Sequence, residues 1–144
     1  MSKSKRRSAS AGSPPPPEFF VDRSLGRYEV PEALRAAGLA VHTMADIYGE
    51  DWGQRLQDET WLADVSQAGM VALFKDDAIR RRPAQIAAVE AGGLRCFCLT
   101  NANLKGAVQV QWFLDNLARI QRAALKAGPY VYGVYDNRIE LLWL

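Results

Sequence analysis

Short apolar runs separated by segments with helical spacing form the main pattern of this chain. Runs of strand length lie near residues 19–22, 39–43, 70–74 and 94–99. The run at 70–74 has no polar residue, as expected for a strand that is buried on both faces. Strands that alternate with helices predict right-handed βαβ units, and hence an α/β fold with a mostly parallel sheet.

Glycine, proline and aspartate mark where the helices between these strands begin and end. The predicted helices run from Pro31 to Ala37, from Asp58 to the glycine at 69, from Pro83 to the glycines at 92–93, and from Leu104 to Ala124. Residues 44–57 predict a loop with one helical turn. Two apolar runs, 130–135 and 138–143, flank Asp136-Asn137 and predict a terminal β-hairpin.

Composition divides the chain into a tail and one domain. Residues 1–17 are rich in Ser, Lys and Pro and end in four prolines, which predicts a disordered basic tail. Residues 18–144 supply the apolar side chains for a core, because 49% of the chain is hydrophobic. No apolar run approaches the roughly 20 residues of a membrane span. We therefore expect a cytoplasmic protein without a membrane partner.

Zinc chemistry is not expected from the cysteines. Cys96 and Cys98 lie one residue apart inside an apolar run, and the chain has a single histidine. This set lacks the ligand spacing of a structural zinc site. Both cysteines are interpreted as buried, reduced core residues.

Acidic and basic residues are unevenly distributed, although the net charge is only +2. Residues 1–17 have four bases and no acid, residues 18–77 have 12 acids and 5 bases, and residues 78–144 have 4 acids and 9 bases. Such a division suits a metal site beside a phosphate-binding face. Chance clustering on a solvated surface would look similar.

Five of the acids follow the predicted strands or open a helix between them. Asp22 is the first polar residue of the run at 19–22 and ends it. Asp76 and Asp77 follow strand 70–74, and Asp58 and Glu59 open a helix. Ligands of open parallel sheets bind at the carboxyl ends of the strands. If the first and third strands are close neighbours, these carboxylates gather at one edge.

Carboxylates that lie close together repel and raise one another's pKa. Such a cluster costs stability unless a cation compensates its negative charge. Oxygen ligands without thiolates suit Mg²⁺ or Mn²⁺. A metal held in this way lowers the pKa of a bound water and neutralises charge on a phosphate, which permits phosphodiester hydrolysis. The alternative is that each Asp satisfies free backbone N–H groups at a strand end or helix N-cap.

Two segments resemble the motifs of PIN-like domains, in particular a subgroup similar to VapC-type toxins. Residues 19–25 read FFVDRSL, an apolar strand followed by Asp and, two residues later, Ser. Residues 58–77 read DETWLADVSQAGMVALFKDD, an acid, a short helix, glycine, an apolar strand and a second acid. The similarity extends over residues 18–144, including the 94–100 strand and the closing hairpin.

This resemblance implies a three-layer sandwich with sheet order 3-2-1-4-5 and a Mg²⁺- or Mn²⁺-dependent endoribonuclease, the toxin of a toxin–antitoxin pair. Asp22 matches the first metal-binding acid, and Ser24 the hydroxyl that orients it or a metal-bound water. Either Asp58 or Glu59 matches the second acid. Asp76 matches the third. Asp77 is either a fourth ligand or a helix cap, and Asn101 is a neutral alternative.

The remaining candidates concern partners. Basic residues beside the acids are expected to hold the RNA backbone, namely Lys75, Arg80, Arg81 and Arg82. Tyr130, Tyr132 and Tyr135 of the hairpin could present an aromatic face to an antitoxin or to a second copy in a homodimer. The competing interpretation is a non-catalytic PIN-like module that binds a protein or nucleic acid. An enzyme requires the acids to converge, whereas a binding module does not.

Overall fold

The computed structural model describes residues 16–26, 28–49, 58–75 and 82–143, and the side chains of Asp58, Glu59 and Trp143 lie outside this description. Its strands are β1 (Glu18–Val21), β2 (Ala40–Thr43), β3 (Val71–Phe74), β4 (Arg95–Leu99), β5 (Tyr130–Val134) and β6 (Ile139–Trp143). Its helices are the 3-10 helix η1 (Arg23–Leu25), α1 (Glu29–Ala36), α2 (Met44–Tyr48), α4 (Asp58–Gln67), α5 (Pro83–Gly92), α6 (Gly106–Asp115) and α7 (Leu117–Ala123).

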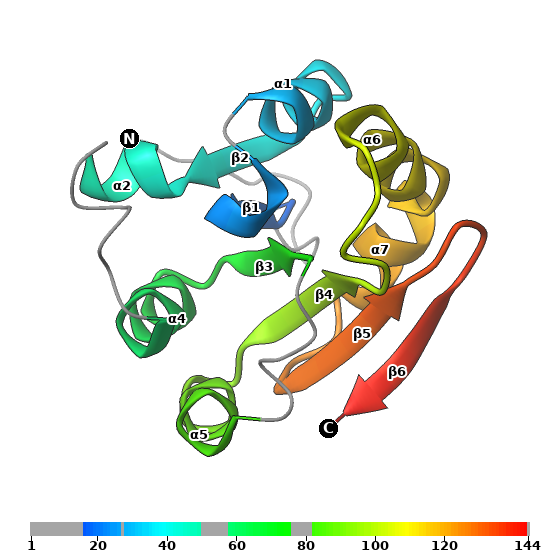
Figure 1. The fold of residues 1–144 in the computed structure, drawn as a ribbon. Coiled ribbons are helices and arrows are strands. Elements are labelled where there is room, and N and C mark those ends of the chain that lie inside the picture. The colour runs from blue at the N-terminus through cyan, green and yellow to red at the C-terminus, as the bar shows by residue number, and fades with distance from the viewer. Residues whose placement is uncertain (1–15, 27, 50–57, 76–81, 144) are drawn as a thin grey trace, which may run out of the picture.

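All six strands form one sheet, in the order β2-β1-β3-β4-β5-β6 (Figure 1). The pairs from β2 to β5 are parallel, and β6 pairs antiparallel with β5 as the second strand of the predicted hairpin. The α/β class and the mostly parallel sheet are thus confirmed, and β1 lies between β2 and β3. The expected order 3-2-1-4-5 is wrong: β1 hydrogen-bonds to β3, and β3 separates β1 from β4.

The sheet divides the interior into two apolar clusters because its side chains alternate between its two faces. On β1, Phe19 and Val21 join one cluster and Phe20 joins the other. The first cluster lies beneath α1, α6 and α7, and the second beneath α4 and α5 (Figure 1). The fold is therefore a three-layer sandwich. No helix among the described segments is long and apolar enough to cross a membrane.

The predicted helix 104–124 consists of two helices that meet at Asn116. This residue is fully buried, and its side-chain Nδ2 donates hydrogen bonds to Trp112 O at 2.9 Å and to Tyr135 O at 2.6 Å. The second bond reaches the hairpin, so the interruption fixes the helical layer to the end of β5. Apolar periodicity continues across the interruption, which is why the sequence pattern did not reveal it.

The expected aromatic face of the hairpin is wrong for Tyr130 and Tyr132, whereas Tyr135 is partly exposed and lies under the Arg138 guanidinium, 4.1 Å from its ring centroid. Tyr130 is 3% exposed, and its hydroxyl donates to Ala123 O at 2.7 Å. Tyr132 packs against the core and stacks on Phe97. Alternation along β5 places both rings on the face that α6 and α7 cover, so these tyrosines stabilise the core.

Both cysteines are free and buried, as predicted. They lie on the same face of β4, within the second cluster, and burial raises the pKa of the Cys96 thiol. A protonated, buried thiol is a poor nucleophile and a poor metal ligand. The cysteines therefore play no part in the candidate site.

Replacing Asn116 with Ala should destabilise the protein by about 1–3 kcal/mol, because two backbone carbonyls lose a buried donor. The free energy of unfolding from urea denaturation measures this effect. Gln111→Ala is the matched control, since the Gln111 side chain is exposed and bonds only to Asp115 Oδ1 among the described residues. Its effect should stay within about 0.5 kcal/mol. Equal losses in both variants would contradict the role of Asn116.

Candidate functional site

The carboxyl ends of the parallel strands lie along one edge of the sheet, which we call the rim. Helices α1, α5 and α6 each follow a strand and so begin at the rim. Helix α4 leads into the start of β3 and therefore runs from the rim toward the opposite edge. Loops and helix N-termini meet at such an edge, which makes it the usual ligand site of an open parallel sheet.

Asp22 is the first residue after β1 and lies at the rim. Its backbone N–H donates to Leu73 O at 2.9 Å, so the β1–β3 ladder continues one residue beyond the strand. The carboxylate Oδ2 accepts a hydrogen bond from Ser24 N at 3.2 Å and caps η1. The residue is 8% exposed. Asp22 thus places a nearly buried carboxylate directly after β1, at the rim.

Ser24 joins the ends of two strands. Its hydroxyl Oγ accepts a hydrogen bond from Lys75 N at 3.2 Å, across 51 residues of sequence. Lys75 directly follows β3 and directly precedes Asp76 in the sequence. Asp22, Ser24 and Lys75 are therefore brought together at a single point of the rim.

Strand alternation gives the side of the sheet on which Asp22 lies. Phe20 belongs to the cluster beneath α4 and α5, and Asp22 follows it by two residues, so both lie on that side. Helix α4 begins at the rim on the same side (Figure 1). The backbone at residues 58 and 59 thus starts α4 at the rim, on the side of the sheet where Asp22 lies.

Several predicted site residues lie outside the description. These are Asp76, Asp77, Arg80 and Arg81, together with the side chains of Asp58 and Glu59. Within the described segments, no group of three or more His, Cys, Asp or Glu side chains is arranged to hold a metal. Of the predicted basic residues, Lys75 is partly buried and Arg82 is exposed just before α5. Asn101 is exposed at the end of β4, where its Oδ1 accepts from Asn103 N at 2.9 Å.

One buried polar residue at the rim was missed from the sequence. Gln85 lies in the first turn of α5 and is 4% exposed. It precedes the buried Val89 by four residues, which puts both on the same face of the helix. A polar residue in a core-facing position was the signal that could have revealed it.

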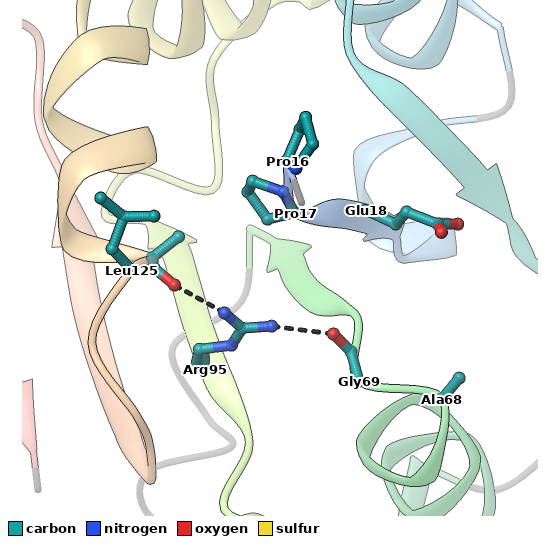
Figure 2. A pocket seen from close by; sticks show the side chains of 8 residues that line it. Pro16, Pro17, Glu18, Ala68, Gly69, Arg95 and Leu125 are labelled. Carbon is teal, nitrogen blue, oxygen red and sulfur yellow. Dashed lines mark hydrogen bonds between the residues drawn. The ribbon is translucent and has the colours of Figure 1, made fainter. Parts of the chain in front are cut away.

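A pocket of about 360 Å³ lies at the other edge of the sheet, where β1 and β4 begin (Figure 2). Arg95 lies in this pocket and donates to Ala124 O at 2.6 Å and to Gly69 O at 2.8 Å. The two carbonyls follow α7 and α4, which lie on opposite faces of the sheet. The guanidinium therefore stabilises two helix ends, and the pocket is separate from the rim.

Known proteins with related sequences identify the family. The family model of the PIN-like domain matches residues 17–101, more than half of the chain. The chain belongs to the PIN-like domain family. A relative from Mycobacterium tuberculosis (strain ATCC 25618 / H37Rv), named putative ribonuclease VapC45, is 38% identical over 121 residues. The match covers 84% of this chain and 88% of the relative. No solved structure matches this chain significantly.

The described donors of this PIN-like domain fit a divalent cation. The Asp22 carboxylate and the Ser24 hydroxyl are hard oxygen groups, the donor type that Mg²⁺ and Mn²⁺ prefer. Both belong to the family motif at residues 19–25. These two described side chains are therefore of the donor type that a Mg²⁺ or Mn²⁺ site needs.

Ser24→Ala should destabilise this PIN-like domain by about 1 kcal/mol, because the Lys75 N–H loses its acceptor. Urea denaturation measures the change. Ser66→Ala in α4 is the control, since the buried Ser66 hydroxyl has no hydrogen-bond partner among the described residues. Its loss should leave the free energy of unfolding unchanged or raised. Unchanged stability of Ser24→Ala would show that the contact with Lys75 does not hold the strand ends together.

Proposed function

We propose that this PIN-like domain is a metal-dependent endoribonuclease and the toxin of a toxin–antitoxin pair. The observation that carries the proposal is the hydrogen bond from Lys75 N to Ser24 Oγ. It brings the end of β3, which leads directly to Asp76, beside the nearly buried Asp22. The name of the mycobacterial relative supports the same activity.

In this proposal, carboxylates from three parts of the chain hold Mg²⁺ or Mn²⁺ at the rim. Asp22 comes from β1, Asp58 or Glu59 from α4, and Asp76, with Asp77 as a candidate fourth ligand, from the segment after β3. The bound metal would lower the pKa of a water molecule and neutralise charge on the scissile phosphate. Ser24 keeps Asp22 in place by donating its backbone N–H to the carboxylate.

Helical spacing favours Asp58 over Glu59 as the second acid. Position 58 precedes the buried Trp61 and Leu62 by three and four residues, so it shares the helix face that packs on the sheet. Position 59 precedes the buried Leu62 by three residues but the exposed Ala63 by four, so it lies at the margin of that face. We therefore propose that Asp58 is the ligand.

The substrate and partners follow from this assignment. Lys75, Arg80, Arg81 and Arg82 are proposed to bind the RNA backbone electrostatically beside the acids. A cognate antitoxin is the proposed protein partner. We also propose that two copies of the chain form a homodimer. Residues 18–144 are proposed to form the catalytic domain and residues 1–17 a basic tail, in a protein that acts on RNA in the cytoplasm.

Mn²⁺ should stabilise the protein, because the cation relieves repulsion among the carboxylates and binds only the folded state. At about 100 times its Kd, the gain is about 2.7 kcal/mol. Differential scanning calorimetry with EDTA or Mn²⁺ measures it. The gain should shrink in Asp22→Asn. Equal gains in the wild type and Asp22→Asn would exclude Asp22 as a ligand.

Asp76→Asn should abolish metal-dependent RNA cleavage while leaving the fold intact, because an amide is a weaker, neutral ligand. Cleavage of a fluorescent RNA and circular dichroism measure the two properties. Asp77→Asn should be milder if Asp77 caps a helix, since Asn caps about as well as Asp. A similar loss in both variants would instead indicate that both acids bind metal. Full cleavage by Asp76→Asn would contradict the assignment of Asp76 as a metal ligand.

A further inference from the structure

The sheet has two edge strands, and their outer sides differ. β2 and β6 end the strand order, and each pairs with a single neighbour among the described strands (Figure 1). An open edge presents unpaired backbone N–H and C=O groups, which natural proteins commonly shield with charged side chains or covering elements. Comparing β2 with β6 therefore indicates which edge can accept a further strand.

Charged side chains shield β2. Arg35 Nη2 donates to Val41 O at 3.0 Å, so a guanidinium lies on a backbone carbonyl of this strand. The same group binds Asp46 Oδ2 at 2.7 Å, and His42 contacts Glu18 at 2.6 Å. A strand that approached β2 would have to displace the Arg35 contact and remove water from these polar groups. Such an edge disfavours pairing with another chain.

The outer edge of β6 is less protected. Within the described part of the chain, no charged side chain donates to the backbone of β6. The one charged residue of this strand is Glu140, whose carboxylate forms a salt bridge with Arg138. Leu141 is 47% exposed, which is unusual for a large apolar side chain on a strand. The edge is therefore apolar and its charge is locally compensated.

The hairpin shows which backbone groups of β6 face outward. Tyr135 N donates to Arg138 O at 2.8 Å, so the backbone of Arg138 faces β5. The register is regular from the turn to Leu141. Backbone groups alternate in direction along an antiparallel strand, so those of Ile139 and Leu141 face outward and those of Glu140 face β5. Leu141 thus combines an outward N–H and C=O with an exposed apolar side chain.

We propose that β6 pairs antiparallel with β6 of a second copy, with the twofold axis at Leu141, so that two sheets continue into one. The inference rests on the homodimer of the proposed function and assigns its interface. Twofold symmetry is the commonest symmetry of homo-oligomers, and it brings the same surface of both copies together. An edge strand that meets itself in this way pairs antiparallel, and Leu141 of each copy then lies beside that of the other.

Charge and chain geometry select this register. An axis at Glu140 would place two carboxylates directly opposite each other, and like charges in that position are destabilising. An axis at Ile139 would set the turn at 136–137 against the strand of the other copy. With the axis at Leu141, each Glu140 lies opposite Leu142, and apolar side chains meet at the centre. The outward backbone groups of Leu141 also form the central pair of hydrogen bonds.

The test is the molar mass of the full chain, measured by size-exclusion chromatography with light scattering over a range of concentrations. The wild type should be a dimer. Leu141→Lys and Leu141→Glu each place two like charges at the axis, so each should weaken the dimer at least about tenfold. An equimolar mixture of the two variants should restore the dimer, because opposite charges then meet. A substitution that merely disturbs the monomer would not produce this rescue.

Ile47→Lys is the matched control, because Ile47 is 40% exposed and belongs to α2, which contacts β2 at the other edge of the sheet. It should leave the dimer intact. Equal weakening by Ile47→Lys would reveal a general charge effect and overturn the inference. A dimer that survives in Leu141→Lys, or a wild-type mass of a single chain, would overturn it as well. If circular dichroism shows that the charged variants do not fold, Leu141→Thr decides, since threonine suits a strand and should weaken the dimer several-fold.

The outcomes separate the inference from the proposed activity. None of the proposed metal ligands belongs to β6, so RNA cleavage is an independent measurement. Retained metal-dependent cleavage together with a failed mass test would overturn the interface alone. A wild type that forms the predicted dimer but cleaves no RNA with Mn²⁺ would overturn the proposed activity and leave the interface standing.

Discussion

The junction between the ends of β1 and β3 is the contact on which the rim depends. Two hydrogen bonds form it, from Asp22 N to Leu73 O and from Lys75 N to Ser24 Oγ. The first extends the sheet past the strand, and the second ties the exit of β3 to the turn after β1. A serine two residues after an aspartate thus links segments that lie about 50 residues apart in sequence.

Local patterns predicted the elements of the fold well. The apolar runs and their flanking glycines and prolines placed all the strands and the hairpin within a few residues. The order of the strands was not predictable in the same way, because it depends on which edges pair across long crossovers. Asp22 and Asp76 can gather at one edge only if β1 and β3 are close neighbours, whereas the resemblance implied another strand order.

The sequence predicted those parts of the candidate site that belong to a short local motif. Asp22 and Ser24 were found because they follow an apolar strand in a recognisable order. Gln85 was not found, since its burial depends on how α5 packs against the sheet. The break at Asn116 was also missed, because it depends on a contact with the distant Tyr135. The side chains of Asp58 and Glu59 remain predictions.

Arg95 has a mechanical consequence. Its guanidinium lies at the edge of the sheet opposite the rim and holds the end of one helix from each face. The two outer layers of the sandwich are therefore fastened to each other at the edge away from the acids. One side chain thus couples two helices from opposite layers, so loss of the guanidinium would release the ends of α4 and α7 at the same time.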